Sequence, residues 1–261
     1  RKFTRLTLRD NPDISALSFN DQVPQEQREA YESKMSGLSP LGSYRIMERD
    51  QQQRLVPAAA RPEYVPVRYI VPLSINRQVV GYDIYSEPLR RNAIERARRT
   101  KAMAVTSPLQ LVQDREKRVG LLGLLPVFAE TEETGPQKER LLGFAATVIR
   151  VDEMVQIATR SKIPSNLVFR LTDADAPDGQ NLLYRSEALD SASREWNQTP
   201  QWKTLLSVGD RSWELSIYVT KQYLREHRPW LAWAVGVVGL IFSALLQMLL
   251  LGMTGQAMVI R

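Results

Sequence analysis

Apolar residues at helical spacing predict three short helices. Residues 24–35 begin with a proline and carry a narrow apolar stripe among polar side chains, which is typical of a surface helix. Residues 151–160 are predicted to form another helix. The third is predicted from residue 88 to about residue 99, where the face turned inward would carry Leu89, Ala93, Ile94 and Ala97.

Short apolar runs between these helices predict strands. Runs 109–112 and 119–128 flank a charged turn and are expected to be antiparallel neighbours, and runs 202–208 and 212–220 are expected to form a hairpin. Further strands are predicted at residues 65–72, 78–85, 102–106, 141–150, 167–171 and 182–184. The predicted fold class is therefore α+β, with two small antiparallel sheets in tandem and a boundary in the polar insertion at residues 130–140.

A long uncharged segment follows these strands. No charged residue occurs between Pro229 and Ile260, and within residues 231–251 the only polar side chains are Ser243 and Gln247. A helix of about 20 residues spans about 30 Å, the hydrocarbon thickness of a bilayer. Residues 221–261 are therefore predicted to hold a transmembrane helix.

Small and polar residues recur along one face of this predicted membrane helix. Small residues let two helices approach closely, and a glutamine amide can donate a hydrogen bond across the pair. We expect this face to form the contact of a homodimer, the alternative being that such residues are simply common in membrane helices. The face consists of Ala232, Gly236, Gly239, Ser243 and Gln247.

Composition limits the available chemistry. The chain has 261 residues, a formal net charge of +6, one histidine and no cysteine. Disulfide frameworks and cysteine nucleophiles are thereby excluded, and no nucleophile elbow or Walker loop is found. The acidic loop at residues 172–179 lacks the spacing of an EF-hand. We expect no catalytic residue, no metal and no cofactor, so the region is predicted not to be an enzyme.

A cluster of cations lies on the helix predicted at residues 88–99. Because the cluster contains no aromatic residue, a solvated or ion-paired face is favoured over contact with nucleic acid. Another alternative is that one or two of the arginines hold an anionic group of a ligand. The cluster consists of Arg90, Arg91, Arg96, Arg98, Arg99 and Lys101.

Asp83 is the most unusual acid in the chain because it lies in an apolar predicted strand. A buried carboxylate is costly unless a ligand, an arginine or backbone amides satisfy it. Asp83 is therefore either a ligand anchor or the partner of a nearby arginine such as Arg68 or Arg90, and the residues alone leave both interpretations open.

Charges near the membrane helix give an incomplete signal for orientation. Lys221, Arg225 and Arg228 favour a cytoplasmic location for the preceding residues, but long domains cross the membrane largely regardless of such charges. The chain begins at Arg1 without a methionine, in an amphipathic stretch. We therefore expect an upstream segment with a first membrane helix.

A series of motifs along the first 155 residues resembles the CHASE domain. That family consists of extracytoplasmic sensor modules of plant cytokinin receptors and of bacterial transmembrane histidine kinases and nucleotide cyclases. Residues 141–155 are also similar to the segment that opens the membrane-proximal half of bacterial members. The motifs are LSFNDQVPQEQREAYE (17–32), EYVPVRYIVP (63–72), GYDIYSEPLRRNAIERAR (81–98), VTSPLQLVQ (105–113) and GLLGLLPVF (120–128).

The resemblance implies a domain organisation. Residues 1–20 would form a stalk helix, 21–135 a membrane-distal PAS-like subdomain that binds the ligand, 136–220 a membrane-proximal PAS-like subdomain, and 221–261 the membrane helix with the start of a linker. It also implies a ligand site, by position, at Asp83, Val105 and Thr106, with an apolar or aromatic wall from Tyr69, Tyr85, Leu124 and Phe128. Around Asp83 the run Ile84 to Glu87 departs from the plant pattern.

The function implied is that of a sensor. Residues 1–228 would lie in the periplasm, bind a small organic ligand such as an adenine derivative, and signal through the inner membrane to a kinase or diguanylate cyclase. One alternative is an adaptor domain that recognises a periplasmic protein, and another is a membrane-anchored enzyme. An empty or polar pocket beside a large exposed apolar patch would favour the adaptor.

Overall fold

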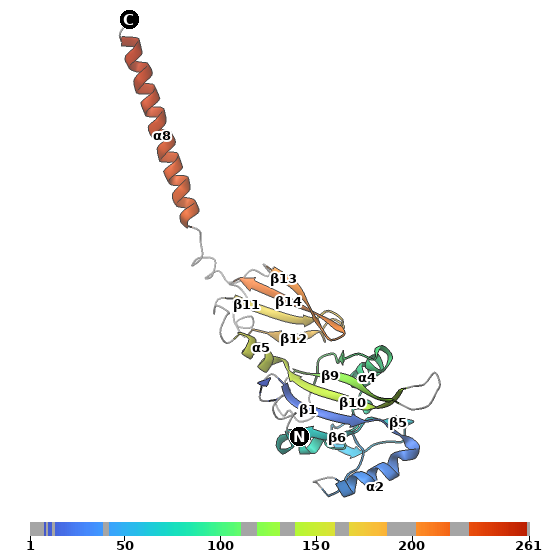
Figure 1. Ribbon diagram of the computed structural model, residues 1–261. Coiled ribbons are helices and arrows are strands. Elements are labelled where there is room, and N and C mark those ends of the chain that lie inside the picture. The colour runs from blue at the N-terminus through green and yellow to red at the C-terminus, as the bar shows by residue number, and fades with distance from the viewer. Residues whose placement is uncertain are drawn as a thin grey trace.

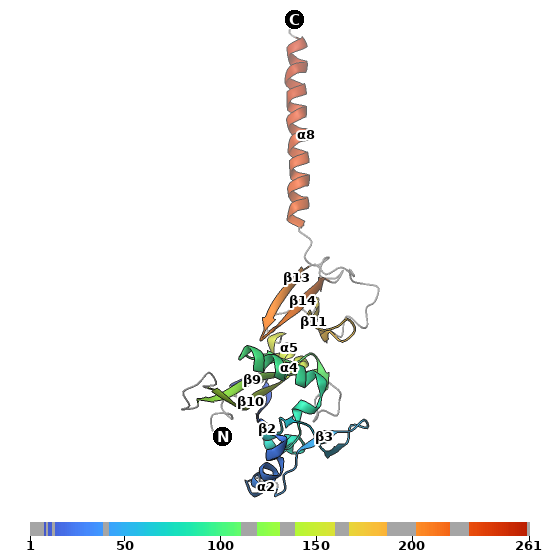
Figure 2. The same ribbon diagram turned by 90° about the vertical axis from the view of Figure 1, so that its right-hand side faces the viewer.

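The computed structural model describes residues 8, 10–11, 14–38, 42–110, 119–130, 139–159, 167–186, 202–219 and 230–259. Its parts follow one another along a long axis (Figures 1 and 2). Helix α2 (Arg28–Leu38) lies at one end, and a six-stranded sheet, a four-stranded sheet and the helix α8 (Trp230–Val259) follow. The predicted α+β class, with antiparallel sheets in tandem and an apolar C-terminal helix, is confirmed.

The first sheet is antiparallel, with the order β6-β1-β10-β9-β7 and with β8 also paired to β9. The predicted pairing of residues 109–112 with 119–128 is confirmed by β8 and β9. Near the end of β1 the backbones of β1 and β10 approach so closely that a Cβ on Gly143 would overlap the Asn20 carbonyl oxygen. The strands are β1 (Ile14–Asp21), β6 (Val67–Val71), β7 (Ala104–Val105), β8 (Leu109–Gln110), β9 (Val119–Glu130) and β10 (Glu139–Arg150).

Short elements between β1 and β6 extend this part of the molecule. Two small pairs, β2 with β5 and β3 with β4, lie beside α2, which follows the 3-10 turn η1. Their side chains form a separate small core around Ile46 and Tyr64, both fully buried. The bounds are β2 (Val23–Pro24), η1 (Gln25–Gln27), β3 (Met47–Arg49), β4 (Leu55–Pro57) and β5 (Glu63–Tyr64).

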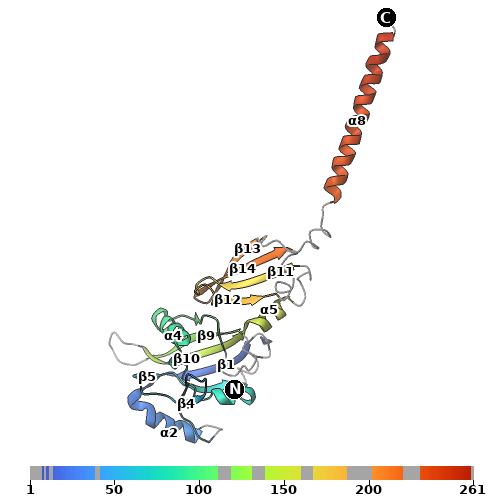
Figure 3. The same cartoon turned by 180° about the vertical axis from the view of Figure 1, so that it is seen from behind.

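Helix α4 (Pro88–Thr100) covers the first sheet on the side that faces the second sheet (Figure 3). Ala93, Ile94 and Ala97 are fully buried and pack with Leu124 and Phe144 of the sheet. The inward face predicted from helical spacing is thereby confirmed. The polypeptide reaches α4 from β6 through α3 (Leu73–Asn76), η2 (Arg77–Val79) and η3 (Ile84–Ser86).

The second sheet is also antiparallel and has the order β12-β11-β14-β13. Helix α5 (Val151–Thr159) begins directly after β10 and connects the first sheet to the second. Its Val151 and Val155 share a buried core with Val105 of the first sheet and Trp213 of the second. The strands are β11 (Leu167–Asp173), β12 (Leu182–Arg185), β13 (Trp202–Val208) and β14 (Arg211–Val219), the last two forming the predicted hairpin.

The β13–β14 turn joins the two sheets. The Asp210 carboxylate accepts hydrogen bonds from Arg96 Nε at 2.6 Å and from the Val105 N–H at 2.8 Å. Burial alone would raise the pKa of Asp210, but these two hydrogen bonds lower it below its usual value. The carboxylate therefore stays ionised and ties the turn of the second sheet to α4 and β7.

Three expectations from the sequence were wrong. Residues 14–20 belong to strand β1 rather than to a stalk helix, and the rest of the expected stalk lies mostly outside the described residues. Residues 78–85 form two 3-10 turns with isolated bridges instead of a strand, since Gly81 turns the chain at a φ of +85°. Residues 130–140 do not separate the sheets, because Glu130 of β9 pairs with Glu139 of β10. The first sheet therefore ends at Arg150.

Helix α8 is long and apolar enough to cross a membrane over Trp233–Leu251, judged by length and composition, and none of that stretch is buried. Gly236, Gly239, Ser243 and Gln247 of the expected dimer face are exposed on it. The side chain of Ala232 lies outside the described part. The homodimer stays a prediction.

Candidate functional site

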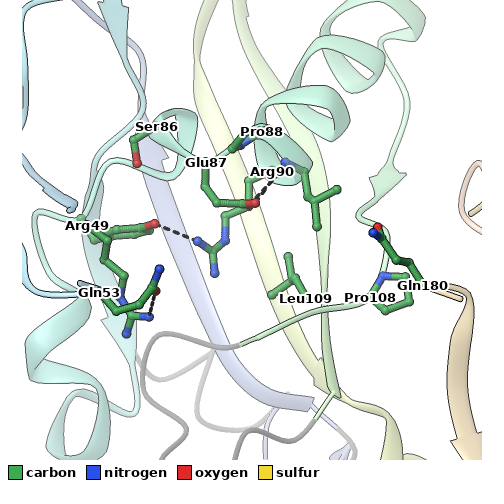
Figure 4. Close-up of a pocket in the computed structure, with 11 residues that line it drawn as sticks. Arg49, Gln53, Ser86, Glu87, Pro88, Arg90, Pro108, Leu109 and Gln180 are labelled. Atoms are coloured by element: carbon green, nitrogen blue, oxygen red, sulfur yellow. Dashed lines mark hydrogen bonds between the residues drawn. The ribbon is translucent and has the colours of Figure 1, made fainter. Parts of the chain in front are cut away.

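A cavity of about 830 Å³ lies where the first sheet, the β3–β4 hairpin and the β11–β12 loop meet. Its volume falls in the range of roughly 300–1,000 Å³ that is typical of small-molecule sites. Charged, amide and apolar side chains share the lining (Figure 4). The lining residues are Arg49, Gln53, Tyr82, Ser86, Glu87, Pro88, Leu89, Arg90, Pro108, Leu109 and Gln180.

Arg90 brings a buried cation to this cavity from the first turn of α4. The residue is 4% exposed, and its Nη1 donates a hydrogen bond to the Tyr82 hydroxyl at 2.9 Å. The guanidinium also lies over the Tyr82 ring, 5.3 Å from the ring centroid. In Figure 4 it extends from α4 toward the side of the cavity formed by Arg49. Tyr82 therefore fixes the orientation of this cation.

Among the described lining residues, Glu87 is the acid. Its carboxylate interacts with the start of α4. Its carboxylate accepts hydrogen bonds from the backbone N–H groups of Leu89, at 3.2 Å, and of Arg90, at 3.1 Å. A carboxylate at this position satisfies the first amides of a helix and interacts favourably with the helix dipole. Pro88 at the first helical position completes the start of α4.

Arg49 brings a second cation from the β3–β4 hairpin. Successive side chains of a strand point to opposite faces, so Glu48 and Arg49 face different neighbours. Glu48 pairs with Arg61, whereas Arg49 lines the cavity and donates to Gln53 Oε1 at 2.8 Å. The hairpin thus brings a second guanidinium to the lining of the cavity, beside Gln53 (Figure 4).

The remaining walls are mainly apolar. Leu89 of α4 and Leu109 of β8 line the cavity together with two prolines. Gln180, in the loop between β11 and β12, is the lining residue that comes from the second sheet. In Figure 4 it lies beside Pro108, on the side away from Arg49. The cavity therefore touches elements of both sheets.

Asp83 lies outside this lining. Its side chain is fully buried, and one oxygen accepts hydrogen bonds from the N–H groups of Val65, at 2.8 Å, and Tyr85, at 3.0 Å. The other oxygen pairs with Arg61 at 3.0 Å. Burial raises the pKa of Asp83, and these three donors oppose that rise. The sequence left two interpretations of Asp83 open, a ligand anchor or the partner of an arginine such as Arg68 or Arg90. The structure gives Asp83 an arginine partner, and that partner is Arg61.

The structure does not bring the other predicted ligand residues to the cavity either. The family resemblance implied seven ligand residues, and none of them is among the described lining residues of the cavity. Tyr82 and Leu109 line it and lie close to some of the seven in sequence. Val105, Thr106 and Leu124 are buried, and the Thr106 hydroxyl accepts a hydrogen bond from the Leu122 N–H at 3.0 Å. These side chains serve packing and backbone pairing.

The three aromatic candidates are more accessible but are separated. Tyr69 is exposed and stacks on Phe19. The Tyr85 hydroxyl donates to Glu95 at 2.6 Å, and burial together with this acid raises the Tyr85 pKa to about 12. Lys101 lies over the Phe128 ring. The ligand site implied by family resemblance at these seven residues stays a prediction.

The basic side chains on and just after α4 have different contact partners. Arg96 pairs with Asp210, Arg98 with Glu63 at 2.9 Å, and Lys101 with Glu139 at 2.6 Å. The favoured interpretation of a solvated or ion-paired face describes these three residues together with Arg91 and Arg99, which are exposed. Arg90 is the member that lines the cavity, and the alternative in which an arginine holds an anionic group of a ligand stays a prediction.

The acidic loop at residues 172–179 is held by basic and backbone groups. Asp173 is fully buried and pairs with Arg211 at 2.7 Å, and Asp175 accepts from the Ser212 N–H at 2.7 Å. Within the described residues no group of three or more acids or histidines could hold a metal ion.

Sequence reasoning missed Arg49, Gln53 and Gln180. The polar run at residues 50–53 between two short apolar runs is typical of a hairpin, and this signal could have placed Arg49 at the end of a strand. No comparable signal marks Gln180, because a loop residue meets another subdomain only through tertiary packing.

Comparison with known proteins gives one family match and distant relatives. The model of the CHASE domain matches residues 1–184. Hybrid signal transduction histidine kinase A of Dictyostelium discoideum is 24% identical over 218 residues, which cover 74% of this chain and 10% of that protein. The chain thus spans about a tenth of the length of this relative.

Solved structures with a similar outline include extracellular sensor regions. An extracellular ligand binding receptor from Desulfohalobium retbaense shares 12% identity at a TM-score of 0.47, covering 84% of this chain and 32% of that chain. The periplasmic sensory domain of the Campylobacter jejuni chemoreceptor Tlp1 shares 10% identity at a TM-score of 0.41, with 86% and 78% covered. With TM-scores below 0.5, these likenesses tell nothing about a ligand of this chain.

Proposed function

The chain belongs to the CHASE-domain family, and on that premise we propose that it binds a small organic molecule outside the cytoplasm and controls a cytoplasmic output domain. CHASE domains are the extracellular sensors of signalling receptors, so the sensor role follows from the family itself. The proposed role is non-catalytic. The output domain that we propose is a histidine kinase or a diguanylate cyclase.

The observation that carries the ligand proposal is the cavity between the two sheets. Its lining combines two guanidinium groups, side-chain amides and apolar walls, and a few convergent polar groups in an apolar pocket are typical of ligand sites. Because Asp83 is satisfied by Arg61 and backbone amides, this cavity supports the proposal better than the adenine contacts implied by family resemblance.

The position of the cavity supports a route for the signal. A ligand that touches both α4 and Gln180 favours one arrangement of the two sheets over another, and it shifts the equilibrium only by its difference in affinity for them. The Asp210 contacts join α4 to the hairpin that contains β14, the last described strand before α8. We propose that this hairpin carries the displacement toward α8.

In a bacterial cell, this role would place residues 1–228 in the periplasm and α8 in the inner membrane, with two copies pairing through the α8 face. The absence of native cysteine allows single-cysteine labelling without prior removal of other thiols. We expect a Ser74→Cys variant, whose residue is exposed on α3, to react in intact cells with a membrane-impermeant maleimide. Arg261→Cys is the matched position beyond the membrane helix and should react only after permeabilisation. The reverse pattern would contradict the orientation.

A ligand screen tests the binding role. The whole chain in detergent is heated with adenine derivatives, organic acids, amino acids and neutral metabolites, and its unfolding temperature is followed. A ligand that binds the folded state stabilises it by RT ln(1 + [L]/Kd), about 2.7 kcal/mol at 100 times Kd. We expect at least one compound to raise the unfolding temperature saturably. A folded chain that responds to none of these classes would count against the small-molecule role.

One observation favours a protein partner as a second candidate. Strand β13 lies at the edge of the second sheet and exposes Trp202 (52%), Leu205 (65%) and Leu206 (41%). Exposed apolar groups on an edge strand are typical of contacts with another chain. A periplasmic protein that binds the chain, and loses binding in Leu205→Lys, would support this alternative.

A further inference from the structure

The edge strand of the second sheet carries exposed apolar side chains. Among the described strands, β13 pairs with β14 alone. Trp202 is 52% exposed, Leu205 65% and Leu206 41%. Successive side chains of a strand point to opposite faces, so Leu205 lies on the face opposite to that of Trp202 and Leu206. The exposed apolar surface therefore follows the edge of the sheet rather than one of its two faces.

The two ends of the β13–β14 hairpin lie in different surroundings. At the turn, the Asp210 carboxylate accepts hydrogen bonds from a side chain of α4 and from the Val105 N–H, so this end is held by the first sheet and its helix. At the open end, Trp202 pairs with Ile217, and β14 ends close by at Val219. The open end is therefore the one from which the chain continues toward α8.

The course of the chain brings β13 next to a bilayer that contains α8. Residues 220–229 separate β14 from α8, which is long and apolar enough to cross a membrane over Trp233–Leu251. In Figures 1 and 3, β13 is the strand of the second sheet that lies toward α8, whereas β12 lies toward the first sheet. The intervening residues carry Lys221, Arg225 and Arg228 against one acid, Glu226, and such a balance favours contact with anionic headgroups.

The side chains of this edge match the chemistry of a lipid headgroup layer. Tryptophan is enriched where membrane meets water, and leucine gains free energy when its apolar surface leaves water. The outer backbone groups of an edge strand need hydrogen-bond partners, which water and headgroups supply and hydrocarbon does not. The edge therefore suits the headgroup depth and no deeper position. Because α8 tethers the sheet to the bilayer, even a small apolar surface meets lipid at a high effective concentration.

We propose that the edge of β13 rests on the lipid headgroup layer of the membrane that α8 spans, with Trp202 and Leu205 in contact with lipid. This inference rests on the proposed position of α8 in the membrane and adds a second membrane contact to it. The hairpin is then held by α4 at its turn and by lipid along its edge. A displacement of the first sheet would therefore tilt the hairpin on the membrane surface.

A second copy of the chain fits this edge less well than lipid does. Two identical edge strands related by a twofold axis pair in antiparallel fashion. The two β14 strands would then lead toward opposite ends of the joined sheet, whereas both α8 helices have to enter the same membrane in the same direction. Pairing with a second copy, or with a periplasmic protein, is therefore an outcome of the test that would contradict the proposal.

The test uses the whole chain in nanodiscs of phosphatidylcholine and phosphatidylglycerol that hold one copy each. Because the chain has no native cysteine, Leu205→Cys can carry a single environment-sensitive fluorophore. Asp178→Cys is the matched control, since Asp178 is exposed in the β11–β12 loop of the same sheet. Ser243→Cys on α8 reports separately whether that helix lies in the bilayer.

Quenching by spin-labelled lipids then locates each fluorophore. We expect a nitroxide on the headgroups to quench the fluorophore at position 205 and to leave the one at position 178 unchanged. A nitroxide on the lipid chains should quench the fluorophore at position 243. Trp202→Glu, added to the Leu205→Cys chain, should reduce quenching at position 205, because a carboxylate next to that site opposes contact with lipid. Gln156→Glu adds the same charge at an exposed position of α5 and should have no effect.

Four outcomes would overturn the proposal. Two of them are equal quenching at positions 205 and 178 while position 243 is quenched, and equal effects of Trp202→Glu and Gln156→Glu. Disulfide crosslinks between two Leu205→Cys chains in vesicles, without quenching by lipid, would assign the edge to a second copy. Quenching at position 205 that a bound periplasmic protein replaces would assign it to that partner. A fluorophore at position 243 that lipid does not quench would count against the proposed function as well, because α8 would then lie outside the bilayer.

Discussion

Asp83→Ala is expected to lower the free energy of unfolding by about 3–5 kcal/mol, the usual effect of removing one partner from a buried ion pair. The Val65 and Tyr85 amides would lose their acceptor inside the protein, and an unsatisfied buried donor costs about 1–3 kcal/mol. Arg61 would keep Glu48 as a partner but would lose its contact with the loop before α4.

The same substitution should also loosen one wall of the cavity. The Asp83 backbone N–H donates to the Met47 carbonyl at 2.7 Å, and its side chain holds Arg61, which pairs with Glu48 on the same hairpin. Arg49 follows directly on that strand. A loss of ligand affinity in Asp83→Ala would therefore not demonstrate a ligand contact, because the hairpin that carries Arg49 is expected to move.

The measurement combines urea unfolding with hydrogen exchange of the backbone amides. Protection should fall first in peptides that contain Val65 and Tyr85, and less in β11 and β14. Asp178→Ala removes an exposed aspartate from a loop and is the matched control, with an expected change within about 0.5 kcal/mol. A change that small in Asp83→Ala would contradict the structural role of this carboxylate.

Asp173→Ala is expected to destabilise the second sheet by a similar amount, about 3–5 kcal/mol. Asp173 is fully buried, and Arg211 would retain a guanidinium that is 6% exposed without its carboxylate. The Asp175 N–H would lose its acceptor at the same time. Hydrogen exchange should increase in β11 and β14, with β1 and β10 affected less.

A double substitution tests whether the unpaired charge of Arg211 causes the loss of stability in Asp173→Ala. In Asp173→Ala with Arg211→Met, no charge remains in the buried position, so the loss should be smaller than the sum of the two single losses. Asp178→Ala again serves as the control for removal of an acid. Additive losses would show that Asp173 and Arg211 contribute independently, which would contradict a coupled buried pair.

Elements with strong local patterns were predictable from sequence. Helix α4 has a proline at its start and buried residues at helical spacing, so local preference and tertiary packing agree. The apolar segment of α8 needs no tertiary information, because length and composition define it. Strands β9 and β10 were located correctly, but a run of polar residues between two strands does not reveal whether it joins neighbours in one sheet or separates two domains.

The candidate site was predictable only in part. The burial of Asp83 and its need for a partner followed from its apolar neighbours, whereas the choice of Arg61 depends on how the chain folds between β4 and β5. Several arginines on α4 were candidates for an anionic ligand, and only the tertiary structure shows that Arg90 lines the cavity whereas Arg96 and Arg98 contact Asp210 and Glu63 outside it. Gln180 comes to the cavity from a loop of the other sheet.

The position of β1 next to β10 has a consequence for the synthesis of the chain. Asn20 donates to the Phe144 carbonyl across 124 residues, so β1 has no partner on that side until β10 has been made. At about 5–20 residues per second the interval is roughly 6–25 s. During that time β1 can pair only with β6, and its other edge, beside Leu17 and Phe19, stays open. This edge is where a chaperone is expected to bind the nascent chain.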